Sequence, residues 1–463
     1  MYRSLLLLNA FLGAASTLSA QRDTVNLDGV VVTGAREKSD IRHLPHDVTV
    51  VGRGSLTASY QPSVLPTLSQ QVPGLFVTTR GVLGYGLSTG AAGTIKMRGI
   101  GGMADMLVLI DGLPQYAGLY GHPLADTYQT MMAERVEVVS GPASSVYGSN
   151  ALGGVVNLVT RTMDTNGTRT DLNLQGGSYG TFVGTLTNRL RQGRFSSVAA
   201  VNYERTDGHR PNAAFSQVSG FVKLGYDLSH YWQIDGRVNL AYQSSSNPGP
   251  VTAPLIDNDM RITRGMTALS LTNDYGRLSG AIRTYYNWGH HHINDGYVAG
   301  NNPQAAYYIH NDRMGGVSAY ESLTLFSATR VTLGFDFQHF GGHAWQKVLA
   351  DGSRVDLARR SVNEVAGYID LRHDIVFWLT ADVALPPDHH SVAGNERVPQ
   401  GGLTARLSPT TELKAIVGKG FRNPTLRELY MFRPANADLA PQRLWTYELS
   451  LRQRLLEGRW GCG

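Results

Sequence analysis

Residues 134–161 read ERVEVVSGPASSVYGSNALGGVVNLVTR, and this stretch decides the fold. Two apolar, β-branched runs, at 136–139 and 155–159, flank a segment rich in Gly, Pro, Ser and Asn. Such runs are typical of buried strands joined through tight turns. Glycines occupy the turning points of this segment: Gly141, Gly148, Gly153 and Gly154. A residue without a Cβ allows backbone angles and close approach that others cannot adopt. We therefore expect two buried strands joined through a glycine corner.

The composition restricts the class of protein. The 463 residues include 53 glycines and 22 tyrosines, with only 17% charged residues, and this favours strands and turns over helices. The net charge of +5 is scattered, whereas nucleic-acid binding needs a concentrated basic patch. The single cysteine, Cys462, excludes a disulfide-stapled domain and a zinc site made of cysteine pairs.

The N-terminus has the pattern of a secretory signal peptide. In MYRSLLLLNAFLGAASTLSAQ, Arg3 precedes a short apolar run at 5–12, and small residues follow at 19–20. We expect a signal peptide over residues 1–20. No later run approaches the ~18 apolar residues of a spanning helix. An exported chain of this kind can be periplasmic, secreted or a membrane β-barrel.

Period-two alternation is clearest in residues 232–243. One face carries Trp232, Ile234, Gly236, Val238, Leu240 and Tyr242. The other carries Gln233, Asp235, Arg237, Asn239, Ala241 and Gln243. Alternation over ~10 residues is typical of a transmembrane strand with one lipid face and one polar face. Residues 331–339 repeat the pattern, and roughly 15 such strands fit between 168 and 455.

A soluble sandwich or propeller also alternates, and this reading stays open from the pattern alone. Long polar connections, such as 244–259 and 290–314, favour a barrel, because outer-membrane barrels combine short turns with long external loops.

Three segments precede the opening stretch in a fixed order: QQVPGLFV (70–77), IKMRGIGG (95–102) and MLVLIDGLPQY (106–116). Together the four segments resemble the plug domain of TonB-dependent outer-membrane receptors. GKGFRNPTLRELY (418–430) resembles a late-barrel feature of the same family, and the resemblance covers most of residues 28–457. Ser140 stands where the family usually has Arg, and Gln442 where it usually has Glu.

The resemblance implies an α+β plug domain inside a mainly antiparallel transmembrane β-barrel. It divides the chain into a signal peptide (1–20), an N-terminal segment (21–45), a plug (46–163) and a partial barrel (164–463). Barrels of such transporters have about 22 strands, against the roughly 15 counted in this chain. We therefore expect a receptor truncated at its C-terminus.

The resemblance also implies a TonB box within the N-terminal segment. DGVVVTG comprises Asp28, Gly29, Val30, Val31, Val32, Thr33 and Gly34. A short extended segment of strand-forming residues can add itself to the sheet edge of a partner. The expected partner is TonB, the periplasmic energy transducer.

Two sets of residues are candidates for sites in such a receptor. Ring-bearing residues on the plug loops 83–92 and 115–123 would contact the ligand: Tyr85, Tyr116, Tyr120 and His122. Charged plug residues would form ion pairs with the barrel wall: Arg98, Glu134, Arg135, Glu137 and Arg161. Loop packing and ordinary surface charge are the respective alternatives.

The sequence shows no enzymatic motif and no phosphate-binding loop, so we expect neither catalysis nor a cofactor. The run His290, His291 and His292 places two imidazoles on one face of a strand without a visible third ligand. We expect a solvated loop there, and no metal site.

The function implied by the resemblance is TonB-dependent import across the outer membrane of a Gram-negative bacterium. The ligand would be a ferric siderophore or other metal chelate, haem or cobalamin, and the other expected contact is outer-membrane lipid, not nucleic acid. Two alternatives are open: a non-functional truncated remnant of such a receptor, and a passive pore or adhesin.

Overall fold

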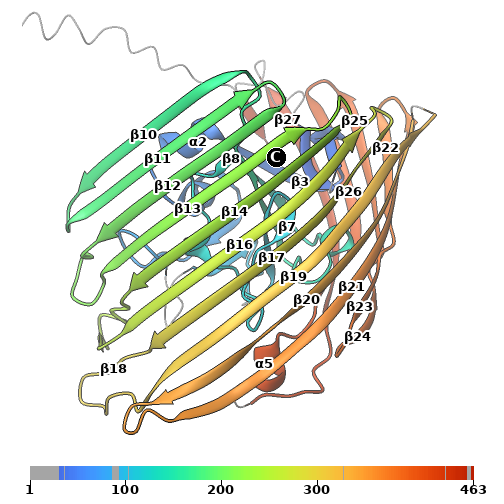
Figure 1. The fold of residues 1–463 in the computed structure, drawn as a ribbon. Helices are drawn as coiled ribbons and strands as arrows, with labels where there is room; N and C mark the ends of the chain where they lie inside the picture. The colour runs from blue at the N-terminus through green and yellow to red at the C-terminus, as the bar shows by residue number, and fades with distance from the viewer. Residues whose placement is uncertain are drawn as a thin grey trace, which may run out of the picture. The chain divides into compact units, whose positions relative to one another are not determined.

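The computed structural model describes most of the chain beyond residue 30 (Figure 1). The described residues are 31–35, 37–85, 93–102, 104–326, 328–432, 434–455 and 460–462. The expected signal peptide and Asp28, Gly29 and Val30 of the expected TonB box lie outside them. Residues from Val31 onward form one compact unit.

The first part of this unit is organised around a five-stranded sheet, which we call the plug sheet. Its strand order is β3-β8-β9-β6-β7, with β6 parallel to β9 and the other pairs antiparallel. The strands are β3 (Asp47–Gly52), β6 (Met106–Ile110), β7 (Leu113–Pro114), β8 (Ala133–Ser140) and β9 (Gly154–Thr160). Strands β6 and β9 are almost fully buried, which fits their continuous apolar runs.

The stretch 134–161 forms β8, the glycine corner and β9, as expected. Gly148 has φ +75°, and Gly154 has φ +145°, which side chains rarely adopt. A Cβ on Gly154 would lie 2.5 Å from the carbonyl oxygen of Val139. The corner therefore brings β9 against β8 only because residue 154 has no side chain.

The helices are short. They are η1 (Ile41–His43), α2 (Arg53–Ala58), α3 (Leu65–Gln71), η2 (Ala125–Thr127), α4 (Ser144–Tyr147) and α5 (Leu426–Tyr430). In the part of the chain that the structure describes, none of them is long and apolar enough to cross a membrane.

Three further two-stranded sheets accompany the plug sheet and the connections. They pair β1 (Val31–Ala35) with β2 (Glu37–Asp40), β4 (Leu75–Val77) with β5 (Ile95–Met97), and β15 (Leu255–Ile256) with β18 (Tyr297–Val298).

The remainder is a large antiparallel sheet, which we call the wall. Its 17 described strands follow one another along the sheet in chain order, from β10 to β28. They are β10 (Gly167–Gly177), β11 (Thr181–Gln192), β12 (Phe195–Thr206), β13 (Phe215–Asp227), β14 (Trp232–Ser245), β16 (Asp259–Asp274), β17 (Leu278–Asn294), β19 (Ala306–Leu325), β20 (Thr329–Val348), β21 (Arg354–Val376), β22 (Leu379–Ala384), β23 (Pro387–His390), β24 (Gly394–Arg397), β25 (Gln400–Ser408), β26 (Thr411–Arg422), β27 (Gln442–Leu455) and β28 (Trp460–Cys462).

The wall has its apolar face outside and its polar face inside. In β14, Val238, Leu240 and Tyr242 are 40–47% exposed, whereas Asn239 and Gln243 are buried. This inversion of the usual burial pattern is the expected signature of strands whose outer face meets lipid. Plug residues contact this polar inner face, as Asp111 does at Arg237.

The connections differ between the two ends of the wall strands (Figure 1). At one end, tight turns join the strands, at 193–194, 228–231, 275–277, 377–378 and 409–410. At the other end, most connections are longer, including 207–214, 246–258, 295–305 and 423–441. We call these the short-turn end and the long-connection end.

Candidate ligand-binding site

The plug segment 115–124 is closed into a loop by one buried tyrosine. The hydroxyl of Tyr128, fully buried, accepts a hydrogen bond from the N–H of Leu124 (2.9 Å) and donates one to the carbonyl of Gln115 (3.0 Å). The two ends of the segment are therefore held together, and Tyr120 and His122 project from the loop between them.

This loop lies directly against the wall at Gly118. The N–H of Gly118 donates to Asp312 Oδ1 of β19 at 3.0 Å. A Cβ on Gly118 would lie 2.8 Å from the carbonyl oxygen of Arg313 and 3.0 Å from that of Gly341. Only glycine permits this approach of plug backbone to wall backbone.

Rings from three parts of the chain gather above the loop in what we call the aromatic patch: Tyr120, His122, Tyr308 and Phe432. The Tyr120 hydroxyl donates to that of Tyr308 at 2.7 Å, and the ring of Tyr308 lies 5.8 Å from that of Phe432. Arg427 of α5 lies 6.0 Å from the Tyr120 ring and 5.9 Å from the Phe432 ring. Tyr308 follows the connection 295–305, so the patch lies at the long-connection end.

The predicted residues Tyr120 and His122 have altered acidity in this patch. Burial raises the pKa of Tyr120 to about 12. Burial and the neighbouring His310 lower the pKa of His122 to about 3, so its ring is neutral at neutral pH. Neutral rings next to a guanidinium suit a flat ligand with negative charge.

The other two predicted ligand contacts lie elsewhere. Tyr116 is buried, with its hydroxyl 3.1 Å from Gln338 Oε1 and its ring edge-on to Phe340. Tyr85 is buried beside Asp126, whose carboxylate accepts its backbone N–H at 2.8 Å. The structure therefore brings only two of the four residues into the patch. Residues 86–92 of the other predicted loop lie outside the described residues.

The histidine run does not form the solvated loop we expected. Residues 290–292 belong to β17, so their side chains alternate between the two faces of the wall. His290 is exposed and bonds Asn311, whereas His291 is fully buried on the inner face. The expected loop was wrong because the strand continues to Asn294, beyond the lipid-facing part of its pattern.

A buried polar cluster lies beneath the aromatic patch, on the inner face of the wall: Arg264, His291, His310 and Asp312. Arg264 Nη1 lies 2.5 Å from Asp312 Oδ2. The Nε2 atoms of His310 and His291 lie 3.5 and 3.9 Å from the same oxygen. Sequence reasoning did not find this cluster, since its members come from three different strands.

Two of the predicted plug–wall residues form ion pairs with the wall. Arg98 Nη1 lies 2.9 Å from Glu448 of β27. Arg161 Nη2 lies 3.3 Å from Asp171 of β10.

The described ion pairs of the other three lie within the plug. Glu134 lies 3.8 Å from Arg161, and Arg135 lies 2.8 Å from Glu137. Glu137 is fully buried, and it also accepts from Asn157 at 3.4 Å. In the contacts described, Glu134 and Glu137 link β8 to Arg161 and Asn157, whereas the pair of Arg135 with Glu137 lies within β8.

An ion pair that sequence reasoning missed joins Asp111 to the wall. Asp111 Oδ2 lies 2.9 Å from Arg237 Nη1 and 3.7 Å from Lys223 Nζ. Burial alone would raise the pKa of Asp111, but these two cations hold it well below its usual range. The period-two pattern of residues 232–243 places Arg237 on the inner face, and this was the only indication in the sequence that it could meet the plug.

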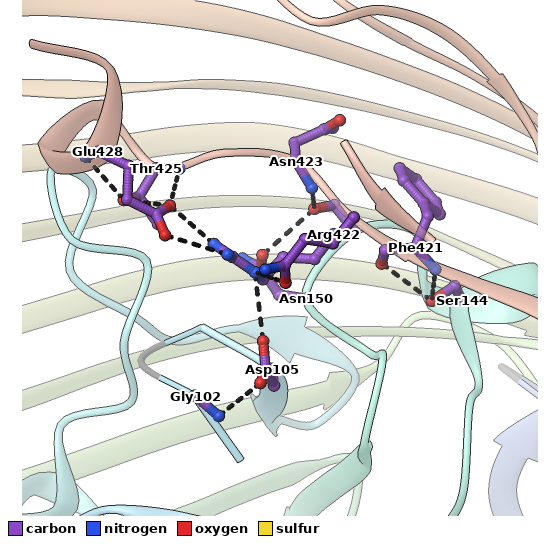
Figure 2. Close-up of polar contacts among 11 residues, drawn as sticks. Gly102, Asp105, Ser144, Asn150, Phe421, Arg422, Asn423, Thr425 and Glu428 are labelled. Carbon is purple, nitrogen blue, oxygen red and sulfur yellow. Dashed lines mark hydrogen bonds and ion pairs between the residues drawn. The ribbon is translucent and has the colours of Figure 1, made fainter. Parts of the chain in front are cut away.

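A second missed contact centres on Arg422 at the end of β26 (Figure 2). Its Nε lies 3.2 Å from Asp105 of the plug, and its Nη1 and Nη2 donate to Glu428 of α5 at 2.8 and 3.0 Å. Next to it, the backbone N–H of Asn423 donates to Ser149 at 3.0 Å. The motif FRNP thus binds both the plug and the long connection 423–441.

The start of the plug contacts the wall near the short-turn end. Lys414 Nζ donates to the carbonyls of Ile41 (3.1 Å) and His46 (3.4 Å), close to the turn 409–410. The ring of His46 lies 3.0 Å from Gln400 Nε2. The described start of the plug, at Ile41, therefore contacts the wall away from the aromatic patch.

Comparison with known families gives two matches. The TonB-dependent Receptor Plug Domain family matches residues 40–155. The family described as TonB dependent receptor-like, beta-barrel, matches residues 223–461, which is more than half of the chain.

Individual relatives are distant in sequence. The chain is 23% identical over 455 residues to the vitamin B12 transporter BtuB of Vibrio vulnificus, covering 95% of this chain and 70% of that protein. A structure of the ferric enterobactin receptor PfeA of Pseudomonas aeruginosa is 16% identical with a TM-score of 0.72, covering 92% and 71% of the two chains. Pyoverdine-bound FpvA of P. aeruginosa is 14% identical with a TM-score of 0.75, covering 93% and 64%.

Proposed function

The chain belongs to the TonB-dependent receptors of the Gram-negative outer membrane, and we propose that it imports a metal chelate bound at the aromatic patch. Proteins of this family are receptors and transporters, not enzymes. Among such ligands, a ferric siderophore is our first candidate, and haem and cobalamin are the other candidates.

The observation that carries the proposal is the composition of the patch. Tyr120 comes from the plug, Tyr308 from the wall, and Phe432 and Arg427 from the connection 423–441. A ligand seated on these rings would contact all three parts at once. Aromatic faces offer apolar area in a fixed orientation, and the guanidinium adds attraction for an anionic chelate.

The position at which the N-terminal segment joins the plug supports energy coupling through residues 28–34. Val31–Ala35 form β1, an extended strand that pairs only with the short β2 among the described strands. This segment enters the plug at Ile41, near the short-turn end. We propose that TonB grasps it there by strand addition and displaces the plug, while the ligand waits at the other end.

The test is uptake of labelled chelates by cells that lack their own receptors and express this chain. Ferric siderophores of catecholate and hydroxamate type, haem and cobalamin would be offered separately. We expect one class to enter in a TonB-dependent manner. Deleting residues 28–34 should abolish its uptake and leave its binding intact. Uptake that persists without these residues would favour a passive pore.

The binding half of the proposal needs its own variants. Tyr120→Ala and Phe432→Ala should each weaken binding by about 10-fold, since each removes a ring contact worth roughly 1–2 kcal/mol. Tyr231→Ala is the control, because this tyrosine is 47% exposed, close to the 43% of Phe432, but stands at the short-turn end. A heat-modifiability gel of the membrane fraction would show that each variant is inserted and folded. Unchanged affinity in both patch variants would refute the assigned site.

A further inference from the structure

The polar cluster beneath the aromatic patch has the donor set of a metal centre. His291, His310 and Asp312 are 0%, 1% and 3% exposed, and one ligand atom from each lies within 4.8 Å of the others. We propose that these three side chains bind a divalent first-row transition-metal ion, with Zn²⁺ as the test ion. Two imidazoles and a carboxylate are the three protein ligands of metal sites that leave a fourth position open for water or substrate.

Unsatisfied nitrogen atoms are the independent observation that points to a ligand. Nδ1 of His291 and both ring nitrogens of His310 are buried without a hydrogen-bond partner. A buried polar atom left unpaired costs free energy, and native structures rarely tolerate several in one place. An ion beside Asp312 Oδ2 would satisfy Nε2 of His310, because a neutral imidazole offers one lone pair.

The geometry needs little adjustment. Ligand atoms about 2 Å from a tetrahedral ion lie about 3.3 Å from one another. The Nε2 atoms of His310 and His291 lie 3.5 and 3.9 Å from Asp312 Oδ2. Small side-chain rotations therefore bring the three atoms to coordination distance.

The neighbouring Arg264 weakens the affinity of this site for a metal ion. Its guanidinium lies 2.5 Å from Asp312 Oδ2 and 3.4 Å from His291 Nε2, so it places a positive charge beside the ion. A carboxylate oxygen has more than one lone pair, and Oδ2 can accept from Arg264 and bind an ion together. We expect a roughly micromolar dissociation constant, weaker than structural zinc sites.

The plug completes the surroundings of this site. Gly118 donates its N–H to Asp312 Oδ1, and the carbonyl of Tyr116 lies 3.4 Å from Arg264 Nη2. The ligand carboxylate is thus oriented from the plug side, as second-shell contacts orient ligands elsewhere. A bound ion would therefore fix the wall beneath the loop that carries Tyr120.

The experiment uses the full chain purified in detergent micelles with any affinity tag removed. Zn²⁺ titration calorimetry should give one ion per chain, and Co²⁺ should give the intense visible bands of a four- or five-coordinate site. His310→Asn and Asp312→Asn should each weaken Zn²⁺ binding at least 10-fold. The control is His290→Asn, on the exposed face of β17 next to the ligand His291, with unchanged affinity expected. Equal affinity in wild type and His310→Asn would overturn the proposal.

If a variant fails to fold, the proposal is tested on the wild-type chain instead. Zinc X-ray absorption should then show two imidazole nitrogens and a carboxylate oxygen at about 2.0–2.2 Å. A shell of oxygen atoms only, or no binding below millimolar Zn²⁺, would refute the site.

Discussion

Arg422 of the wall and Asp105 of the plug form an ion pair of 3.2 Å, and the same guanidinium binds both carboxylate oxygens of Glu428 (Figure 2). Glu428 also completes the capping box of α5 with Thr425. One side chain thus joins the plug, the end of β26 and the helix that carries Arg427.

Replacing this arginine should loosen the plug and α5 together. We expect Arg422→Gln to lower the free energy of unfolding by about 2 kcal/mol, since its charge-assisted hydrogen bonds to two buried or half-buried carboxylates are lost. Hydrogen exchange should rise both near Asp105 and in Leu426–Tyr430. The exposed Arg397 offers the control Arg397→Gln, with no change expected. Faster exchange in α5 alone would show that the plug is held by other contacts.

The ion pair of Asp111 should be among the strongest on the seam between plug and wall. Asp111→Asn keeps the shape and the positive φ of this residue but removes the negative charge that faces Arg237 and Lys223. We expect a loss of about 3 kcal/mol, measured by thermal melting in micelles, because a buried cation keeps its desolvation cost.

The exposed Asp164 provides the comparison for this variant. Asp164→Asn should melt as wild type does. If Asp111→Asn also melted at the wild-type temperature, Asp235, which lies 3.2 Å from Arg237, would have to be the partner that matters.

A methyl group at position 118 should push the plug loop away from the wall. The Cβ of Gly118→Ala would collide with backbone oxygens on two strands, which cannot rotate away as side chains do. We expect a cost of about 1–3 kcal/mol and faster hydrogen exchange in residues 115–124. Gly220→Ala, where no atom lies within 4 Å of the added Cβ, should be neutral. Unchanged exchange in Gly118→Ala would mean that the loop does not rest on β19.

Acid should weaken the attachment of the first plug segment. Burial, and then Lys414, lower the pKa of His46 to about 4 from its ordinary 6.5. The unfolded chain therefore binds a proton first, and stability is lost as the pH falls from 6.5 towards 4, by up to about 3 kcal/mol. His46→Gln should remove this dependence, monitored by hydrogen exchange of residues 41–52 between pH 7 and 4. A pH profile identical in variant and wild type would assign the acid sensitivity to other groups.

The sequence was sufficient for the elements that repeat a local pattern. The apolar runs around the glycine corner predicted β8 and β9, and the alternation in 232–243 predicted which face of β14 is exposed. Both follow from burial periods that are visible within one segment.

Pairings between distant segments could not be read in this way. Asp111 meets Arg237, and His291 meets His310, only after the register of several strands is set. For the histidines of β17, the sequence did indicate which one faces inward. Ile282 and Tyr286 are exposed on the lipid side, so the same parity carries His290 and His292 outward and leaves His291 facing inward.

The hydroxyl of Tyr128 has a mechanical consequence. Its hydrogen bonds to Leu124 and Gln115 tie the two ends of residues 115–124 together, so that this loop moves as one piece. The loop follows directly after β7. A force that moves β7 then shifts Tyr120 and His122 by the same displacement, instead of stretching the loop. Withdrawing the plug and breaking the ring contacts to Tyr308 would thus be a single event, and the bound molecule would need no separate trigger for its release.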